Sequence, residues 1–225
     1  MIFNKFNLKF FRKMENKYIF CIDAGHGGMV DGEYVTAPDK MYEFEDGTQI
    51  FEGVFNREVK DRVVNWAAKE GLTVEDITPE NRDIALSTRV KRVHEVMRDT
   101  NKKPIFISIH GNAYPPDNSA QGWEIYTYPG TSESDKVATE LFMRAKKEFS
   151  SNFSMRTDYS DGDPDREAKF YVLQETAVPA VLTENFFMTN YDDCKFMLSE
   201  DGKDRIAQVH VDALEKVERE EIVKT

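Results

Sequence analysis

The chain has 225 residues, with 41 acidic side chains against 30 basic ones and a net charge of −11 at pH 7. Its 40% hydrophobic and 32% charged residues are typical of a folded globular protein. The acidic balance argues against non-specific nucleic-acid binding and against attachment by bulk charge to anionic membranes or wall polymers. Two cysteines, Cys21 and Cys194, are too few for a disulfide framework or a four-thiolate metal site. Cys21 lies in an apolar run and is expected to be a small buried hydrophobe.

The N-terminal segment, residues 1–16, is expected to be a flexible or basic leader. Its lysines and arginine interrupt the apolar residues and no small-residue cleavage site follows, so it is a poor secretory signal. Met14 is a second candidate start, because the ordered pattern begins just after it. No run of 18 apolar residues exists, so we expect no transmembrane helix. We expect one folded domain over 17–218 and a C-terminal tail over 219–225.

Apolar spacing predicts strands that alternate with helices. Strands are predicted at 18–23, 104–110, 122–128, 170–173 and 180–183, and helices at 57–70, 86–98, 134–149, 192–198 and 203–217. Residues 29–51 lack a steady period and are predicted to form a long loop, and the acidic segment 150–168 a surface loop. The alternation indicates an α/β fold, a single domain with a twisted, mostly parallel or mixed sheet flanked by helices.

Two of the four histidines directly follow predicted buried strands. His26 follows the first strand and His110 ends the second. Ligands of α/β proteins gather beyond the carboxyl ends of the strands, so these imidazoles can converge on one point. His94 and His210 lie within amphipathic helices and are interpreted as surface or half-buried helix residues.

Two glutamates have related positions. Glu184 comes directly after the apolar run 180–183, where a carboxylate is unexpected on packing grounds. Glu52 ends the long loop just before a helix that begins near Asn56, so it is either an acid favoured by the helix dipole or a functional group. Two histidines and a glutamate form the ligand set of a catalytic zinc with an open fourth position, and a further free glutamate would be the general base.

Residues 20–28, FCIDAGHGG, resemble the opening motif of the zinc-dependent N-acetylmuramoyl-L-alanine amidases of the amidase-3 type. The resemblance covers 18–215. The interval between His26 and Glu52 is longer than in the family, and His94 replaces a frequent asparagine. The aromatic residues of this interval, Tyr34, Tyr42 and Phe44, either cover a substrate groove or pack on the body as an ordinary insert. Four further segments match in the family's order: EGVFN at 52–56, DIALSTR at 83–89, ISIHGNA at 107–113, and a closing pair, FYVL at 170–173 with PAVLTENFF at 179–187.

The resemblance implies His26, Glu52 and His110 as ligands of Zn²⁺ and Glu184 as the general base. The implied reaction is hydrolysis of the amide between N-acetylmuramic acid and L-alanine of peptidoglycan stem peptides. The alternatives are another zinc-dependent peptidoglycan peptidase or deacetylase, and a non-catalytic wall-binding module, which would need a lost ligand or base. Neighbouring side chains are expected to fix the imidazole tautomers; the candidates are Asp23, Asn56, Ser108 and Asn112.

The partner implied is peptidoglycan, and we expect a monomer that acts on the cell wall. Because the leader is a poor export signal, reaching the wall would need holin-type release or another export route. This favours a phage endolysin, made in the cytoplasm and released at lysis, over a self-exported autolysin. The glycines at 25, 27 and 28 do not have the spacing of a phosphate-binding loop.

Overall fold

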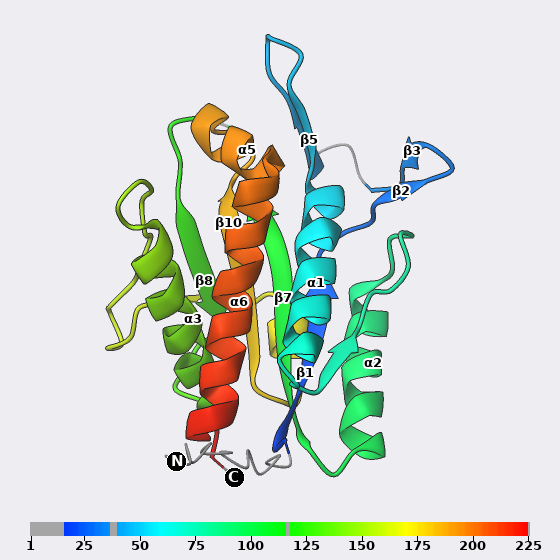
Figure 1. The fold of residues 1–225 in the computed structure, drawn as a ribbon, viewed down its shortest axis with the longest axis vertical. Coiled ribbons are helices and arrows are strands. Elements are labelled where there is room, and N and C mark those ends of the chain that lie inside the picture. The colour runs from blue at the N-terminus through cyan, green and yellow to red at the C-terminus, as the bar shows by residue number, and fades with distance from the viewer. Residues whose placement is uncertain (1–15, 37–39, 116–117, 225) are drawn as a thin grey trace, which may run out of the picture.

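The computed structural model describes residues 16–36, 40–115 and 118–224, so the expected leader lies almost entirely outside the described residues. Its centre is a mixed six-stranded sheet of order β6-β1-β7-β10-β8-β9 (Figure 1). The pairs β1–β6, β1–β7, β7–β10 and β8–β9 are parallel, and only β10–β8 is antiparallel. The expected mixed α/β architecture is therefore confirmed. The strands are β1 Tyr18–Ala24, β6 Val74–Asp76, β7 Lys103–Asn112, β8 Trp123–Thr127, β9 Arg166–Glu167 and β10 Ala180–Phe187.

Helices cover both faces of this sheet. Figure 1 shows α1, α3 and α6 side by side on one face, while α2 and the short α4 pack on the other. Successive side chains of a strand point to opposite faces, so Phe20 and Ile22 join the larger core while Cys21 between them joins the smaller one. The buried position of Cys21 agrees with the prediction. The helices are α1 Glu52–Lys69, α2 Leu86–Asp99, α3 Glu133–Phe149, α4 Tyr171–Gln174, α5 Tyr191–Leu198 and α6 Glu200–Glu220.

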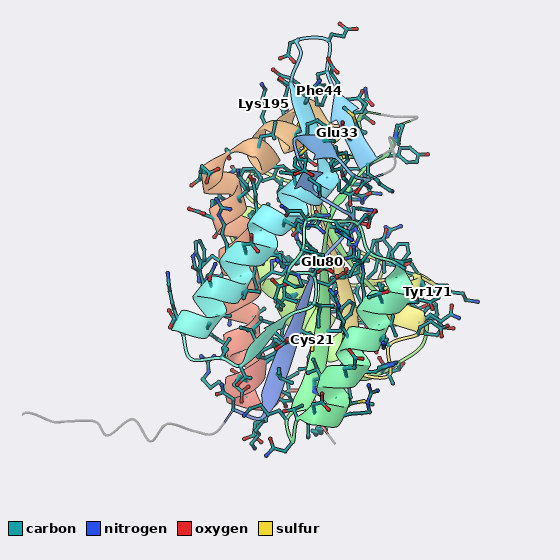
Figure 2. The ribbon with its side chains drawn as sticks, turned by 90° about the vertical axis from the view of Figure 1, so that its right-hand side faces the viewer. Cys21, Glu33, Phe44, Glu80, Tyr171 and Lys195 are labelled. Atoms are coloured by element: carbon teal, nitrogen blue, oxygen red, sulfur yellow. The ribbon has the colours of Figure 1, made fainter. Side chains whose placement is uncertain are left out.

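The predicted long loop at 29–51 contains two small hairpins. Strands β2 (Met29–Val30) and β3 (Glu33–Tyr34) form one, and β4 (Met41–Glu43) and β5 (Gln49–Phe51) form the other. Phe44 packs edge-on against Tyr191 of α5 with ring centroids 5.1 Å apart, and Figure 2 shows it beside Lys195. Tyr42 and Phe44 both pack against the larger core, and the Tyr34 hydroxyl accepts the N–H of Gly53 in α1, so these aromatic side chains pack on the body of the domain.

Other elements also differ from the sequence prediction: β6 was not predicted, and β9 lies in the segment predicted as a surface loop. Residues 170–173, predicted as a strand, form the helical turn α4, in which the Phe170 carbonyl accepts hydrogen bonds from the N–H groups of Leu173 and Gln174. A short apolar run does not by itself distinguish a strand from a buried helical turn. Helix α1 begins at Glu52, several residues before the predicted start.

His210 is fully buried, contrary to the prediction of a surface or half-buried residue. It lies on the side of α6 that faces β10. Its Nδ1 is 2.8 Å from the carbonyl oxygen of Ile206 and its Nε2 is 3.0 Å from Thr183 Oγ1. The carbonyl can only accept, so Nδ1 carries the proton and Nε2 accepts from the threonine. His94 is half-buried, and its Nε2 accepts the N–H of Ala177.

The two ends of the described chain meet beside the start of β1. The Tyr18 hydroxyl, at the start of β1, donates to the Val223 carbonyl over 2.8 Å. Helix α6 continues to Glu220, slightly beyond the expected domain end. None of the helices in the described part of the chain has the length and apolar content needed to cross a membrane.

We predict that His210 makes the fold sensitive to acid. Burial lowers the pKa of His210 to about 4, whereas an unfolded histidine titrates near ~6.5. Between these values the unfolded chain binds the extra proton, so stability present above pH ~6.5 is lost as the pH falls toward 4, by about 3 kcal/mol. Urea denaturation of wild type and His210→Gln at pH 7 and pH 4.5 measures this. The variant should lose less stability between the two pH values; equal losses would contradict the prediction.

Candidate metal centre

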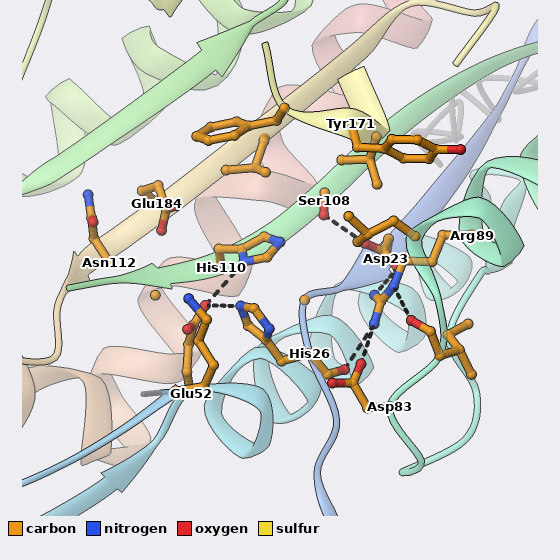
Figure 3. Close-up of a pocket in the computed structure, with 18 of the residues that line it drawn as sticks. Asp23, His26, Glu52, Asp83, Arg89, Ser108, His110, Asn112, Tyr171 and Glu184 are labelled. Carbon is orange, nitrogen blue, oxygen red and sulfur yellow. Dashed lines mark hydrogen bonds and ion pairs between the residues drawn. The ribbon is translucent and has the colours of Figure 1, made fainter. Parts of the chain in front are cut away.

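The candidate site lies at the edge where β1, β7 and β10 end. His26 follows β1 by two residues, His110 is near the end of β7, and Glu184 pairs with His110 in the register of β10 and β7. Because these strands are parallel, their carboxyl ends meet at one edge. Figure 3 shows the side chains of all three, together with Glu52 from the first turn of α1, directed into one pocket.

Glu52 lies between the two imidazoles. Its Oε1 is 3.1 Å from His26 Nε2 and 3.1 Å from His110 Nδ1. The two rings stand edge to face with centroids 5.1 Å apart, and the ligand atoms of the three residues lie within 4.8 Å of one another. Glu52 is the first residue of α1 and only 3% exposed. Glu52 is therefore both an acid at a helix N-terminus and a side chain that faces the candidate site, so the two interpretations from the sequence are compatible.

The protonation states suit a metal. Burial acts to raise the pKa of Glu52, but hydrogen bonds with His110 and then His26 outweigh it and lower the pKa to about 2. Burial lowers the pKa of His110, which favours the neutral imidazole. A carboxylate and neutral imidazole nitrogens are the forms that bind metal ions. Two nitrogens and one carboxylate oxygen within this distance match the three-ligand set of a catalytic zinc.

Glu184 has the features of a proton-transfer group. Its Oε2 is buried and has no hydrogen-bond partner among the described residues. Burial, then the charges of Glu52 and Glu124, raise its pKa well above the usual value. A carboxyl group held in this way needs a polar or cationic partner that the surrounding side chains do not supply. The unpartnered Glu184 oxygen, like the cluster of three ligand atoms, fits a site that holds a metal ion and a water molecule.

A buried ion pair holds the loop that carries His26. Arg89 of α2 and Asp23 of β1 are each 1% exposed, and Arg89 Nη1 donates to Asp23 Oδ1 over 2.6 Å. Arg89 also donates to the carbonyls of Ala24 and, over 3.0 Å, of His26, while Ser108 Oγ donates to Asp23 Oδ2 over 2.7 Å. His26 has a φ of 64°, a left-handed conformation that costs free energy for a residue other than glycine. Arg89 therefore stabilises the strained backbone that aims the His26 imidazole.

Asn56, on α1, contacts both the Glu52 carboxylate and the backbone of Gly25. Its Nδ2 donates to the Gly25 carbonyl over 3.1 Å and lies 3.4 Å from Glu52 Oε1. Gly25 is required for close packing, since a Cβ there would lie 2.1 Å from Cε1 of His110. Of the four expected tautomer-fixing residues, Asn56 contacts Glu52, Asp23 binds both Arg89 and Ser108, and Asn112 donates to Glu124. Among the described contacts, none of the four hydrogen bonds to an imidazole ring.

The pocket has a volume of about 690 Å³. Its apolar wall comes from the start of α2 and from α4. Asn112 and Ala113 line both it and a neighbouring cavity of about 620 Å³. That cavity contains Glu124 and Arg156, which the sequence analysis did not single out. The alternating strand around Glu124 gave no sign that this acid is buried and paired.

Comparisons with known proteins agree with this geometry. The family model described as N-acetylmuramoyl-L-alanine amidase matches residues 20–216. The chain is 27% identical over 205 residues to the Bacillus subtilis (strain 168) protein YqiI, covering 90% of this chain and 85% of that protein. It is 24% identical over 211 residues to an endolysin of Bacillus phage SPP1, covering 87% of this chain and 64% of the endolysin.

The fold also resembles solved structures. An N-acetylmuramoyl-L-alanine amidase from Clostridium difficile 630 superimposes with a TM-score of 0.72 at 23% identity, covering 90% of this chain and 97% of that one. At this identity the likeness supports the fold alone. The family model, however, spans almost all of the described residues. The chain therefore belongs to the N-acetylmuramoyl-L-alanine amidase family.

Proposed function

We propose that the protein hydrolyses the amide between N-acetylmuramic acid and L-alanine of peptidoglycan, with Zn²⁺ held by His26, Glu52 and His110. The observation that carries the proposal is the convergence of these three ligand atoms beside the unpartnered Oε2 of Glu184. Family membership supports the substrate. The similarity to the phage SPP1 endolysin supports a lytic enzyme that acts on the cell wall after release.

Zinc bound by this ligand set would polarise the amide carbonyl and lower the pKa of a water molecule. Glu184 then has two tasks. Its Oε2 accepts a proton from the water that attacks the carbonyl carbon, and it returns this proton to the L-alanine nitrogen as the C–N bond breaks. A cation beside Glu184 favours the anionic form that the first task requires. Glu52, through its negative charge, keeps the imidazoles of His26 and His110 oriented toward one point.

The same ligand set would also serve a zinc-dependent peptidase or deacetylase, and the products separate these activities. Digestion of purified peptidoglycan, followed by mass spectrometry, should give intact stem peptides with a free L-alanine amine. A zinc chelator should abolish the release, and added zinc should restore it. Peptides cut between stem residues, or released acetate, would assign the protein to one of the other classes.

We predict that Glu184→Gln retains zinc but loses activity by about 10²–10⁴-fold, the usual contribution of general acid–base catalysis. The amide keeps the shape of the side chain but cannot accept the proton. Zinc content by mass spectrometry and the rate of stem-peptide release measure the two effects. Glu175→Gln, at an exposed position near the pocket wall, is the matched control and should act like wild type. Wild-type activity in Glu184→Gln would remove it from the mechanism.

We predict that His110→Ala loses zinc and activity together, because only two of the three ligands remain. Zinc stoichiometry after dialysis checks this. His94→Ala removes a histidine whose one hydrogen bond within the described residues is with the Ala177 N–H, and it should keep a full equivalent of zinc. Full occupancy in His110→Ala would exclude this residue from the ligand set.

A further inference from the structure

The second cavity contains an arginine that is aimed by a buried acid. Arg156 Nε donates to Glu124 Oε2 over 2.8 Å, and its guanidinium carbon lies 5.1 Å from the centre of the Phe187 ring. The Arg156 side chain is 37% exposed, whereas that of Glu124 is 3% exposed. In the described part of the chain no hydrogen bond reaches the two terminal nitrogens of Arg156. Glu124 thus fixes the Nε side of the Arg156 guanidinium, while Nη1 and Nη2 are free to donate to a ligand.

Several neighbours share the Glu124 carboxylate. Its Oε1 accepts from Asn112 Nδ2 over 2.6 Å and from the Tyr126 hydroxyl over 2.9 Å. Arg166, whose guanidinium lies over the Tyr126 ring at 5.9 Å, brings its Nε within 3.6 Å of Glu124 Oε2. Two guanidinium groups thus share one carboxylate. The Glu124 carboxylate alone therefore does not balance both guanidinium groups.

This two-arginine site is close to the proposed reaction centre. Glu124 and Glu184 are direct partners in the antiparallel pairing of β8 and β10. Adjacent strands are about 4.8 Å apart, and one extended peptide residue spans about 3.5 Å. Asn112 lines both cavities and connects the site to the metal pocket. An extended chain whose amide lies beside Glu184 would therefore bring its next one or two residues to Arg156.

We propose that Arg156, oriented by Glu124 and assisted by the charge of Arg166, binds a carboxylate on the peptide side of the scissile amide. A guanidinium with two free donors matches a carboxylate, and such charge-assisted hydrogen bonds are the strong ones. The ligand class is an acidic muramoyl peptide. The site would select substrates by their charge. This proposal rests on the proposed function, which defines the bond that is cleaved.

The test compares two synthetic muramoyl peptides that differ only in the residue after L-alanine, which carries either a free carboxylate or a carboxamide. For Arg156→Gln we expect KM for the carboxylate peptide to rise about 10-fold or more, with kcat nearly unchanged. KM for the carboxamide peptide should stay within about twofold of wild type. Any disturbance of Glu124 affects both peptides equally and cancels in the comparison. Arg98→Gln, an exposed arginine of α2, is the control.

Binding provides a readout that does not depend on hydrolysis. Calorimetry with the Glu184→Gln enzyme should show tighter binding of the carboxylate peptide than of the carboxamide, and Arg156→Gln in the same background should remove the difference. Equal losses for the two peptides, or a preference that survives in Arg156→Gln, would overturn the proposal. Wild-type enzyme that binds with this preference but cleaves neither peptide would instead contradict the proposed function.

Discussion

The parallel pairing of β1, β7 and β10 is the constraint on which the site depends. Ala24 pairs with Ile109, and His110 pairs with Glu184, so three segments far apart in the chain end at the same level of one sheet edge. A shift of register by one residue would turn His110 or Glu184 to the opposite face. The apolar side chains of these strands, which fill cores on both faces, are what prevent such a shift.

Ion pairs outside the proposed reaction centre stabilise the backbone and side chains around it. The Asp23–Arg89 pair is buried, and its arginine binds the backbone of the left-handed residue His26. Loss of one partner from such a pair leaves an uncompensated buried charge, which typically costs about 3–5 kcal/mol. On the other side of Glu184, Glu124 orders Asn112 and Arg156. The proposed reaction centre thus lies between two networks of paired charges, one beside the proposed metal ligands and one in the second cavity.

The sequence predicts the parts of this arrangement that depend on local pattern. Apolar runs located the main strands, and the position of His26 and His110 after two of them indicated a shared site. Glu52 could not be separated from an ordinary helix-N-terminal acid without the family resemblance, because its partners are distant in sequence. His210 was misassigned for a similar reason: one polar residue on a helix face does not reveal that β10 and a threonine hydroxyl bury it. The roles of Glu124 and Arg156 arise from pairing across strands and loops, which no local spacing records.

The described chain begins and finishes on the side of the sheet away from the metal pocket, where Tyr18 bonds to Val223. The seven residues of β1 separate this side from the loop of His26, a distance of about 20 Å. A partner domain joined directly before Asn16 or after Lys224 would consequently start on the side opposite the pocket. It could anchor the molecule to a glycan strand without blocking entry of the peptide, which makes this architecture suitable for modular redesign.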